Sequence, residues 1–211
     1  MSEQERGTAV RGETYAGQSR HERVAERRAR IMEAAVQLFA ARDYDDVTVA
    51  DVCVRAKVSK RYFYEEFSDR LDLLLAVHRE LNDWLLDGIA NAVPKQPQDL
   101  RELLGAMVAA MVGMLVEHPE RARVIYINAP RMELRRRGLL RRDAELFGRL
   151  TRRALARPRD RMRRERLLLA LTAGVTEVVI DWLQRGMTDP PQELVDHLTG
   201  LCLSILGGEA K

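Results

Sequence analysis

A chain of 211 residues is long enough for one substantial core, or for a small module joined to a larger one. Its 35 basic and 32 acidic residues leave a net charge of only +3, which excludes a strongly basic field over the whole molecule. The two cysteines, Cys53 and Cys202, lie far apart in apolar patterns, and no opening hydrophobic signal or 18-residue apolar run is found, so we expect a soluble, cytoplasmic protein without membrane contact.

The first predicted helix follows a polar start of the chain. Residues 1–22 mix charges with Gly, Ser and Thr and show no apolar period, which predicts a disordered tail. The next stretch predicts an amphipathic helix that ends near Arg42 and Asp43. Its apolar positions recur with helical spacing and are Ile31, Ala34, Ala35, Leu38 and Phe39.

A short second helix of about eight residues is predicted after Thr48. Thr48 stands where an N-cap is expected, and Asp51 follows three residues later, as in a capping box. After a break at residues 57–58, Ser59 can cap a third helix with Phe63 and Phe67 on its inner face. Residues 68–69, Ser and Asp, then start a longer fourth helix.

Two short helices joined by a tight turn and packed on a longer helix make a helix-turn-helix unit. The side of the third helix opposite its phenylalanines carries cations and hydroxyl groups, from Lys60, Arg61, Tyr62 and Tyr64. A short exposed helix of this kind is suited to the major groove of DNA. The same shape also serves as an ordinary structural corner, so the pattern alone leaves both interpretations open.

The stretch from Arg30 to Val77 resembles the DNA-binding domain of the TetR family of bacterial transcriptional regulators. The similar elements are "I..AA..LF" in the first helix, Tyr44, "TV.D" at the start of the second, "A.VS" across the turn and "Y..F" in the third. The resemblance implies an all-α fold, with a helix-turn-helix domain over residues 23–76 and a larger helical domain for effector binding and dimerisation over residues 77–211. The family commonly has Gly where this chain has Lys57, and often where it has Asp43, so left-handed backbone is expected at both.

The resemblance also implies which residues contact a double-stranded DNA operator. It places the third helix in the major groove, where Lys60 and Arg61 would read base edges, since Arg pairs bidentately with guanine. Tyr62 would touch a thymine methyl group or a phosphate, and the Tyr64 hydroxyl would contact the backbone. The N–H groups and the positive dipole end at a helix start favour phosphate, which adds Thr48 and Arg70 at the starts of the second and fourth helices. The complete predicted set is Thr48, Ser59, Lys60, Arg61, Tyr62, Tyr64 and Arg70; for each, the alternative is a solvated or packing side chain.

The remainder of the chain is predicted to be helical, with breaks at residues 94–98, 118–119, 129–130, 158 and 190–191. The four histidines show no metal spacing, and no phosphate-binding loop or nucleophile elbow is present, so we expect no enzyme, metal or cofactor. A pocket for a small, hydrophobic effector is expected among the middle helices. Its predicted lining, each member of which could equally be plain core, is Trp84, Met107, Met111, Met114, Tyr126, Phe147 and Trp182.

The last two predicted helices carry more apolar surface than one subunit needs. TetR-family members pair these helices across a two-fold axis, which implies a homodimer on a palindromic operator. The predicted interface residues are Leu171, Val175, Val178, Leu194, Leu198, Leu201 and Ile205. The alternative is their burial within one subunit.

One segment departs strongly from the average charge. Between Arg131 and Arg166, 15 arginines stand against five acids, a local charge of +10. Solvated helix faces with internal ion pairs would explain it, as would an anionic effector such as an acyl-thioester or an accessory DNA-facing surface.

Together these features predict a ligand-responsive transcriptional repressor that acts as a homodimer. The alternative from another class is an effector-binding or scaffold protein whose degenerate helix-turn-helix no longer binds DNA.

Overall fold

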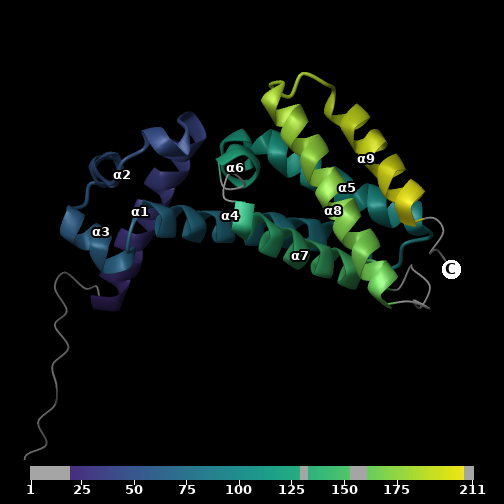
Figure 1. Ribbon diagram of the computed structural model, residues 1–211, viewed down its shortest axis with the longest axis horizontal. Helices are drawn as coiled ribbons and strands as arrows, with labels where there is room; N and C mark the ends of the chain where they lie inside the picture. Colours follow the sequence, from purple (N-terminus) through teal and green to yellow (C-terminus); the bar gives the residue numbers. More distant parts are fainter. Residues whose placement is uncertain (1–19, 129–132, 153–160, 207–211) are drawn as a thin grey trace, which may run out of the picture.

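The computed structural model describes residues 20–128, 133–152 and 161–206, and every regular element in these residues is helical, which confirms the all-α prediction. A small unit at one end contains α1 (Arg20–Ala41), the 3-10 turn η1 (Tyr44–Asp46), α2 (Val49–Ala56) and α3 (Lys60–Glu66) (Figure 1). The long helix α4 (Arg70–Ala92) starts there and runs into a larger unit. The other elements of that unit are α5 (Leu100–Glu117), α6 (Pro119–Arg123), the π-helical η2 (Val124–Asn128), α7 (Glu133–Leu150), α8 (Arg161–Gln184) and α9 (Pro191–Leu206).

The helix-turn-helix forms as its capping residues predict. The Thr48 hydroxyl accepts a hydrogen bond from the Asp51 N–H (3.1 Å), and the Asp51 carboxylate accepts one from the Thr48 N–H (2.9 Å). This backbone hydrogen bond, together with the hydroxyl of the same residue, lowers the pKa of Asp51. Lys57 ends α2 in the left-handed conformation (φ 55°, ψ 47°), as expected, whereas Asp43 is extended (φ −64°, ψ 150°), so that second expectation was wrong.

The core of the small unit is aromatic. Phe39, Phe63 and Phe67 are all buried, and the rings of Phe63 and Phe67 lie 5.8 Å apart between centroids. Because α3 is short, burying these two side chains of its inner face fixes which side remains exposed.

Most predicted boundaries agree with the structure. The breaks at residues 94–98, 118–119 and 190–191 separate consecutive helices, while those at 129–130 and 158 fall outside the described residues. The predicted tail was too long, since α1 begins at Arg20 and residues 20–22 are helical. The expected domain boundary at residues 76–77 falls inside α4, which continues through it without interruption.

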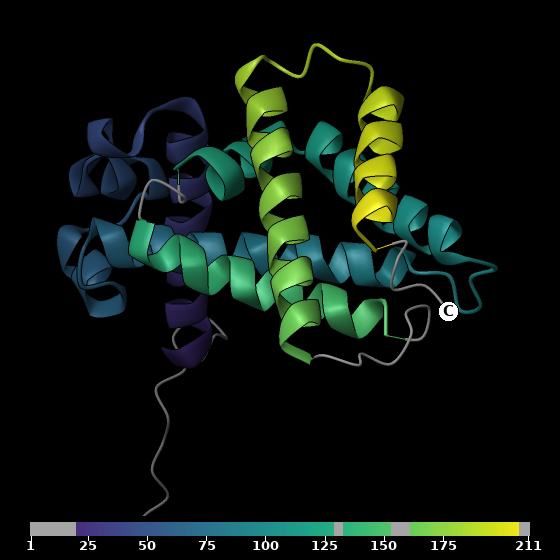
Figure 2. The ribbon, with the colours of Figure 1, turned by 45° about the vertical axis from the view of Figure 1, so that its right-hand side comes forward.

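Helices α5, α8 and α9 give the larger unit its core. Helix α9 lies on α5, and Figure 2 shows α8 crossing α7. Among the described helices, α8 alone is long and apolar enough, by length and composition, to cross a membrane. It buries Leu171 and Trp182 inside the protein and carries Glu177 and Asp181 on its exposed side, as a helix with one side in the core and the other uncovered does.

The guanidinium of Arg70, the first residue of α4, holds the loop between α1 and α2. It donates hydrogen bonds to the carbonyl oxygens of Tyr44 (2.9 Å), Asp45 (3.2 Å) and Val47 (2.5 Å), and it lies 4.0 Å from the centre of the Tyr44 ring. Its side chain is 27% exposed. The Arg70 side chain therefore joins the start of α4 to the loop that precedes α2.

Replacing this guanidinium should destabilise the protein. We expect Arg70→Met to lower the free energy of unfolding by about 2 kcal/mol, because hydrogen bonds to a charged group typically contribute about 1.5–3 kcal/mol. Arg70→Lys should recover only part of the loss, since an ammonium group lacks the planar fork. Urea unfolding followed by circular dichroism would measure both. The matched control is Arg79→Met, an exposed arginine of the same helix; equal stabilities for the two methionine variants would contradict this role.

Candidate functional site

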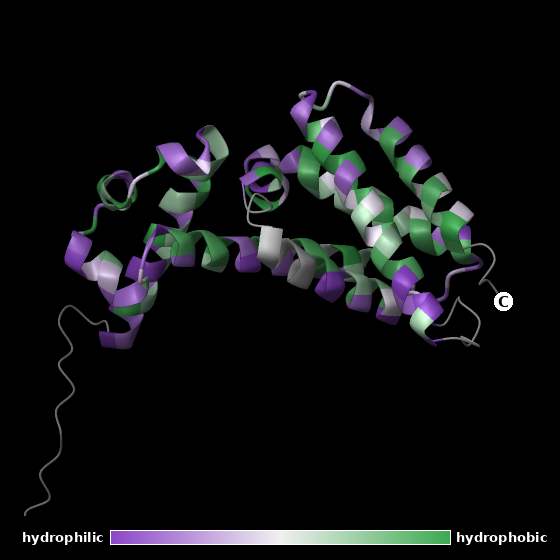
Figure 3. Ribbon diagram, in the orientation of Figure 1, coloured by the Kyte–Doolittle hydropathy of each residue, from purple (hydrophilic) through white to green (hydrophobic). Residues whose placement is uncertain are grey.

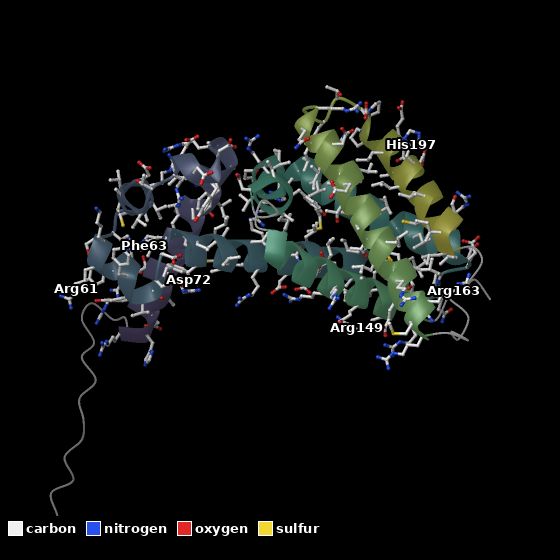
Figure 4. All side chains as sticks on the ribbon, in the orientation of Figure 1. Arg61, Phe63, Asp72, Arg149, Arg163 and His197 are labelled. Carbon is white, nitrogen blue, oxygen red and sulfur yellow. The ribbon has the colours of Figure 1, made fainter. Side chains whose placement is uncertain are left out.

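Helix α3 presents a cationic and hydroxyl-bearing surface to solvent. The side chain of Arg61 is 85% exposed, and Tyr64 and Tyr62 are 56% and 39% exposed. Lys60 and Ser59 are exposed as well. Figure 4 shows Arg61 projecting from the outer end of the small unit, while Phe63, on the same helix, lies within it. The structure thus brings five of the seven predicted DNA-contacting residues onto one short stretch.

The helix starts of the small unit differ in charge. Asp51 lies in the first turn of α2, and Asp69 and Asp72 cap and follow the start of α4. Carboxylates at these two helix starts repel phosphate. The first turn of α3 contains no acid: Ser59 accepts the Tyr62 N–H, and Lys60 and Arg61 follow. The positive end of α3 and its two cations therefore act in the same direction.

Thr48 and Arg70 are less available than the sequence suggested. The Thr48 hydroxyl donates to the Asp51 carboxylate (2.9 Å) while it caps α2, although the residue is exposed. The Arg70 guanidinium is held by three carbonyl oxygens. We correct the assignment of the Arg70 side chain from a phosphate contact to a structural contact, because each of those hydrogen bonds would have to break first.

Arg61 has a single competing partner among the described residues. Its Nε lies 3.1 Å from the Glu65 carboxylate, one helical turn along α3, and both side chains are solvated. Exposed ion pairs of this kind contribute only about 0.3–0.5 kcal/mol. The guanidinium can therefore exchange Glu65 for another acceptor at little cost.

Two arginines of α1 extend this surface, and sequence reasoning missed both. The Arg27 guanidinium lies 4.3 Å from the centre of the Tyr62 ring, and that of Arg28 lies 4.5 Å from the Phe67 ring and 3.5 Å from the Glu66 carboxylate. Figure 3 shows hydrophilic residues over α3 and the N-terminal end of α1. The signal was present as Arg-rich sequence just before the apolar positions of α1, a stretch for which no contact was predicted.

A cavity of about 100 Å³ lies among α4, α5, α7 and α8. Four of the seven predicted lining residues face it: Met107, Met111, Tyr126 and Phe147. Leu171 and Val175, predicted for the dimer interface, line it too.

The other three predicted lining residues lie elsewhere. Trp84 packs against His118 and beneath the Arg121 guanidinium, 4.6 Å from the ring centre. Met114 fills the space left by Gly88, where an added Cβ would overlap its sulfur. Trp182 is 2% exposed and belongs to the general core. These three residues are therefore removed from the predicted pocket lining. Helical spacing predicted the helices that carry them but not the side of the helix on which each side chain lies.

The apolar cavity has one polar corner, built from three elements. Asn82 of α4 donates to the Asp143 carboxylate of α7 (3.2 Å), and Tyr126 of η2 donates weakly to the Met111 sulfur (3.9 Å). Burial raises the pKa of Asp143 and that of Tyr126, and it raises the pKa of Cys202, which also lines the cavity, to about 11. Tyr126 and Cys202 are therefore protonated at neutral pH, and Asp143 is the acid of this cavity.

The predicted dimer residues divide into two groups. Leu171, Leu194 and Leu198 are 1%, 5% and 1% exposed within a single chain, which for these three favours the alternative, burial within one subunit. Val178 is 38% exposed, and Val175, Leu201 and Ile205 are partly exposed. These four keep an apolar surface on α8 and α9.

Several arginines of the basic segment are exposed, whereas Arg164 is partly buried. Arg142 pairs with Asp83 of α4 (2.5 Å) and Arg161 with Glu165 (2.7 Å). Arg141 and Arg149 are exposed, and Figure 4 shows Arg149 on the outer side of α7. Residues 131–132 and 153–160, and the side chains of residues 133–139, lie outside the described part of the chain. Within the described ranges, no group of three histidine, cysteine, aspartate or glutamate residues is placed to hold a metal ion.

Comparison with known proteins agrees with this geometry. Residues 31–77 match the family model described as "Bacterial regulatory proteins, tetR family". Over 103 residues the chain is 33% identical to the HTH-type transcriptional activator FasR of Mycolicibacterium smegmatis, covering 49% of this chain and 47% of that protein. Over 77 residues it is 32% identical to the HTH-type transcriptional regulator HbdR of an Aromatoleum strain, covering 36% and 32%. The chain thus spans less than half the length of these relatives.

A solved structure extends the likeness to the whole fold. The fatty acid degradation regulator FadR from Bacillus halodurans superposes with a TM-score of 0.67 over 86% of this chain and 95% of its own, at 20% identity. At 20% identity, the superposition shows that the two proteins share a fold and says nothing about a shared ligand. The match at residues 31–77 identifies that part of the chain as a TetR-family domain, and the likeness to FadR shows that the chain as a whole has a similar helical fold.

Proposed function

We propose that this protein is a sequence-specific, ligand-responsive transcriptional repressor that binds a palindromic operator as a cytoplasmic homodimer. The observation that carries the proposal is α3, an exposed helix whose first turn bears Lys60 and Arg61, carries no acid and lies beside Arg27 of α1. Such a surface suits the major groove and its phosphate borders.

Operator recognition would divide between two kinds of contact. Arg61 reads a base edge once it leaves Glu65, and Lys60 stands next to it. The Tyr64 hydroxyl, on a side chain 56% exposed, contacts a phosphate and sets the register of α3. Tyr62 is held by the Arg27 guanidinium on one face, which orients it for a thymine methyl group or a phosphate.

The second subunit would pair with the exposed side of α8 and α9. The side chains there are Val178, Val175, Leu201 and Ile205, and the small residues Ala170 and Gly174 on the same side of α8 allow close approach of another helix. A two-fold dimer places two copies of α3 on half-sites whose centres lie about 34–36 Å apart, or a multiple of this, on one side of the duplex.

A bound effector would act on α1 through η2. Tyr126 lines the cavity, and Asn128, two residues later, donates to the carbonyl oxygen of Phe39 near the end of α1. Arg123, just before η2, lies 3.8 Å from Asp43 in the loop after α1. A ligand that displaces Tyr126 thus alters the contacts on which α1 rests, and it shifts operator binding only as far as it prefers one arrangement of α1.

One relative is named an activator, so activation is the second candidate for the regulatory outcome. An activator would use the same surfaces on the same operator. A reporter gene placed behind the operator separates the two outcomes: deletion of the regulator raises expression for a repressor and lowers it for an activator.

The first prediction concerns base reading by Arg61. Arg61→Ala should weaken operator binding by about 1–3 kcal/mol and relax preference at one base pair in each half-site. The matched control is Arg161→Ala, which removes an arginine of equal exposure (87%) from an equivalent ion pair on α8. Titration of cognate and scrambled duplexes by fluorescence anisotropy would measure both. If a folded Arg61→Ala protein keeps the affinity and preference of Arg161→Ala, the base-reading role is refuted.

The second prediction concerns the phosphate contact of Tyr64. Tyr64→Phe should weaken cognate and scrambled DNA by the same factor, because a phosphate contact carries no sequence information. The ring packs edge to face on Phe63, 5.3 Å away, and the substitution retains that contact, so the melting temperature should not change. A change in melting temperature without any loss of DNA affinity would indicate a packing role and favour the scaffold protein without DNA binding.

The third prediction concerns assembly. Light scattering at micromolar concentration should give twice the chain mass of 24.1 kDa. Val178→Arg should return the mass of one chain and weaken operator binding, because it places a charge in the apolar interface. The control is Val116→Arg on α5, where the original side chain has nearly the same exposure (37% against 38%). Single-chain mass for the unmodified protein would contradict the homodimer.

A further inference from the structure

The walls of the cavity between α4, α5, α7 and α8 contain no cation among the described residues. They are largely apolar, from leucine, methionine, valine, isoleucine and phenylalanine side chains. The polar exceptions are Asn82, Tyr126, Asp143, Thr172, Thr176 and Cys202. A pocket of this composition holds an apolar body and selects it by its few polar groups.

The basic segment from Arg131 to Arg166 contributes an acid to these walls. The described residues that it places there are Asp143, Leu146, Phe147 and Leu150. Its nearest arginine in sequence, Arg142, points to Asp83 on α4 and is 48% exposed. The arginines of α7 whose side chains the structure describes, Arg141, Arg142 and Arg149, therefore do not line the cavity, while the carboxylate of Asp143 lies in its wall.

Asp143 retains acceptor capacity toward the cavity. Asn82, which is 4% exposed, donates to Oδ1 of Asp143, and within the described part of the chain no hydrogen bond to Oδ2 is found. The charged groups that act on this carboxylate are Asp83 of α4 and Arg142 of its own helix, α7. Burial raises the pKa of Asp143, since a desolvated carboxylate lacks water and has no cation inside the cavity. A hydrogen-bond donor or a positive charge on a ligand would supply what is missing.

We infer that the effector is an apolar molecule with one hydrogen-bond-donating head group, cationic or neutral, and that Asp143, oriented by Asn82, binds this head group. The inference rests on the proposed function, because it takes from it that a ligand occupies this cavity and changes operator binding. It assigns the head-group contact to α4 and α7 and the apolar body to the methionines of α5. A carboxylate head group, or the phosphates of an acyl-coenzyme A, is rejected, because a second negative charge beside Asp143 in a largely apolar cavity is repelled.

The methionines also bear on ligand size. The cavity of about 100 Å³ is small for a ligand pocket, which typically holds about 300–1,000 Å³. Met107 and Met111 are unbranched and change rotamer readily, so the cavity can lengthen along α5. Short alkyl chains are the appropriate probes.

The test uses four probes with the same eight-carbon chain: octylamine, octan-1-ol, octanoate and octanoyl-coenzyme A. Isothermal titration calorimetry of the full-length protein at neutral pH should show binding of the amine and the alcohol, with octanoate and the thioester at least about tenfold weaker. Asp143→Asn should weaken octylamine by about tenfold or more and reduce its advantage over octanoate. The matched control, Glu145→Gln, removes the same charge from an exposed site on the same helix and should leave the ranking unchanged.

Each outcome decides the inference. Tighter binding of octanoate or the thioester than of the amine and alcohol overturns it, as does equal behaviour of Asp143→Asn and Glu145→Gln, or absence of binding by all four probes. Operator affinity is measured in parallel with saturating octylamine. If octylamine binds through Asp143 and operator affinity does not change, the head-group assignment stands and the ligand-responsive function fails; if DNA binding is absent altogether, the proposed regulator fails independently of the cavity.

Discussion

The structure depends on one continuous helix. Helix α4 starts in the small unit, where Arg70 fixes its first turn to the carbonyl oxygens of the loop before α2, and its second half forms a wall of the cavity through Asn82 and Leu85. A straight helix of this length transmits displacement along its axis, because its backbone hydrogen bonds resist bending. The exposed surface of α3, which we propose contacts DNA, and the cavity are therefore attached to the same rigid helix.

The second connection is through η2. This π-helical segment follows α6 directly and places Tyr126 in the cavity and Asn128 on α1 within a single turn. The Nδ2 group of Asn128 reaches the Phe39 carbonyl, while its buried Oδ1 has no hydrogen-bond partner among the described residues. A buried, half-satisfied amide is held in place by its surroundings and is readily displaced when they change. Single π-helical turns occur frequently at functional sites, and this one connects the cavity to α1.

The small unit could be predicted almost completely from sequence because its signals are local. Thr48, Ser59 and the apolar spacing of Phe63 and Phe67 each fix a helix start or a face within a few residues, and the structure has these elements at the expected positions. The role of Arg70 could not be predicted, since its acceptors lie more than 20 residues earlier in the chain and are backbone oxygens that leave no trace in residue type. The prediction of left-handed backbone at Asp43 was wrong, because this residue is extended where η1 begins.

The contacts in the larger unit were harder to predict from the sequence. Helical periodicity predicts that a helix forms but not which other helices it packs against. Met107 and Met114 are two turns apart on α5, yet one lines the cavity and the other fills the space beside Gly88. Leu171 and Val178 are apolar residues of one helix, and the packing of α8 against its neighbours decides that the first is buried within the chain. The place of Asp143 in the cavity could not be predicted, because this acid stands in a segment of +10 charge and only the structure shows that its side chain lines the cavity.

The account is tested most directly by selecting bound sequences from a pool of randomised duplexes with the full-length protein. It predicts enrichment of a palindrome whose half-site centres lie about 10 base pairs, or a multiple of this, apart, since two copies of α3 must enter major grooves on one side of the duplex. Bound pools that show no enriched sequence, or an enriched sequence without two-fold symmetry, would contradict it.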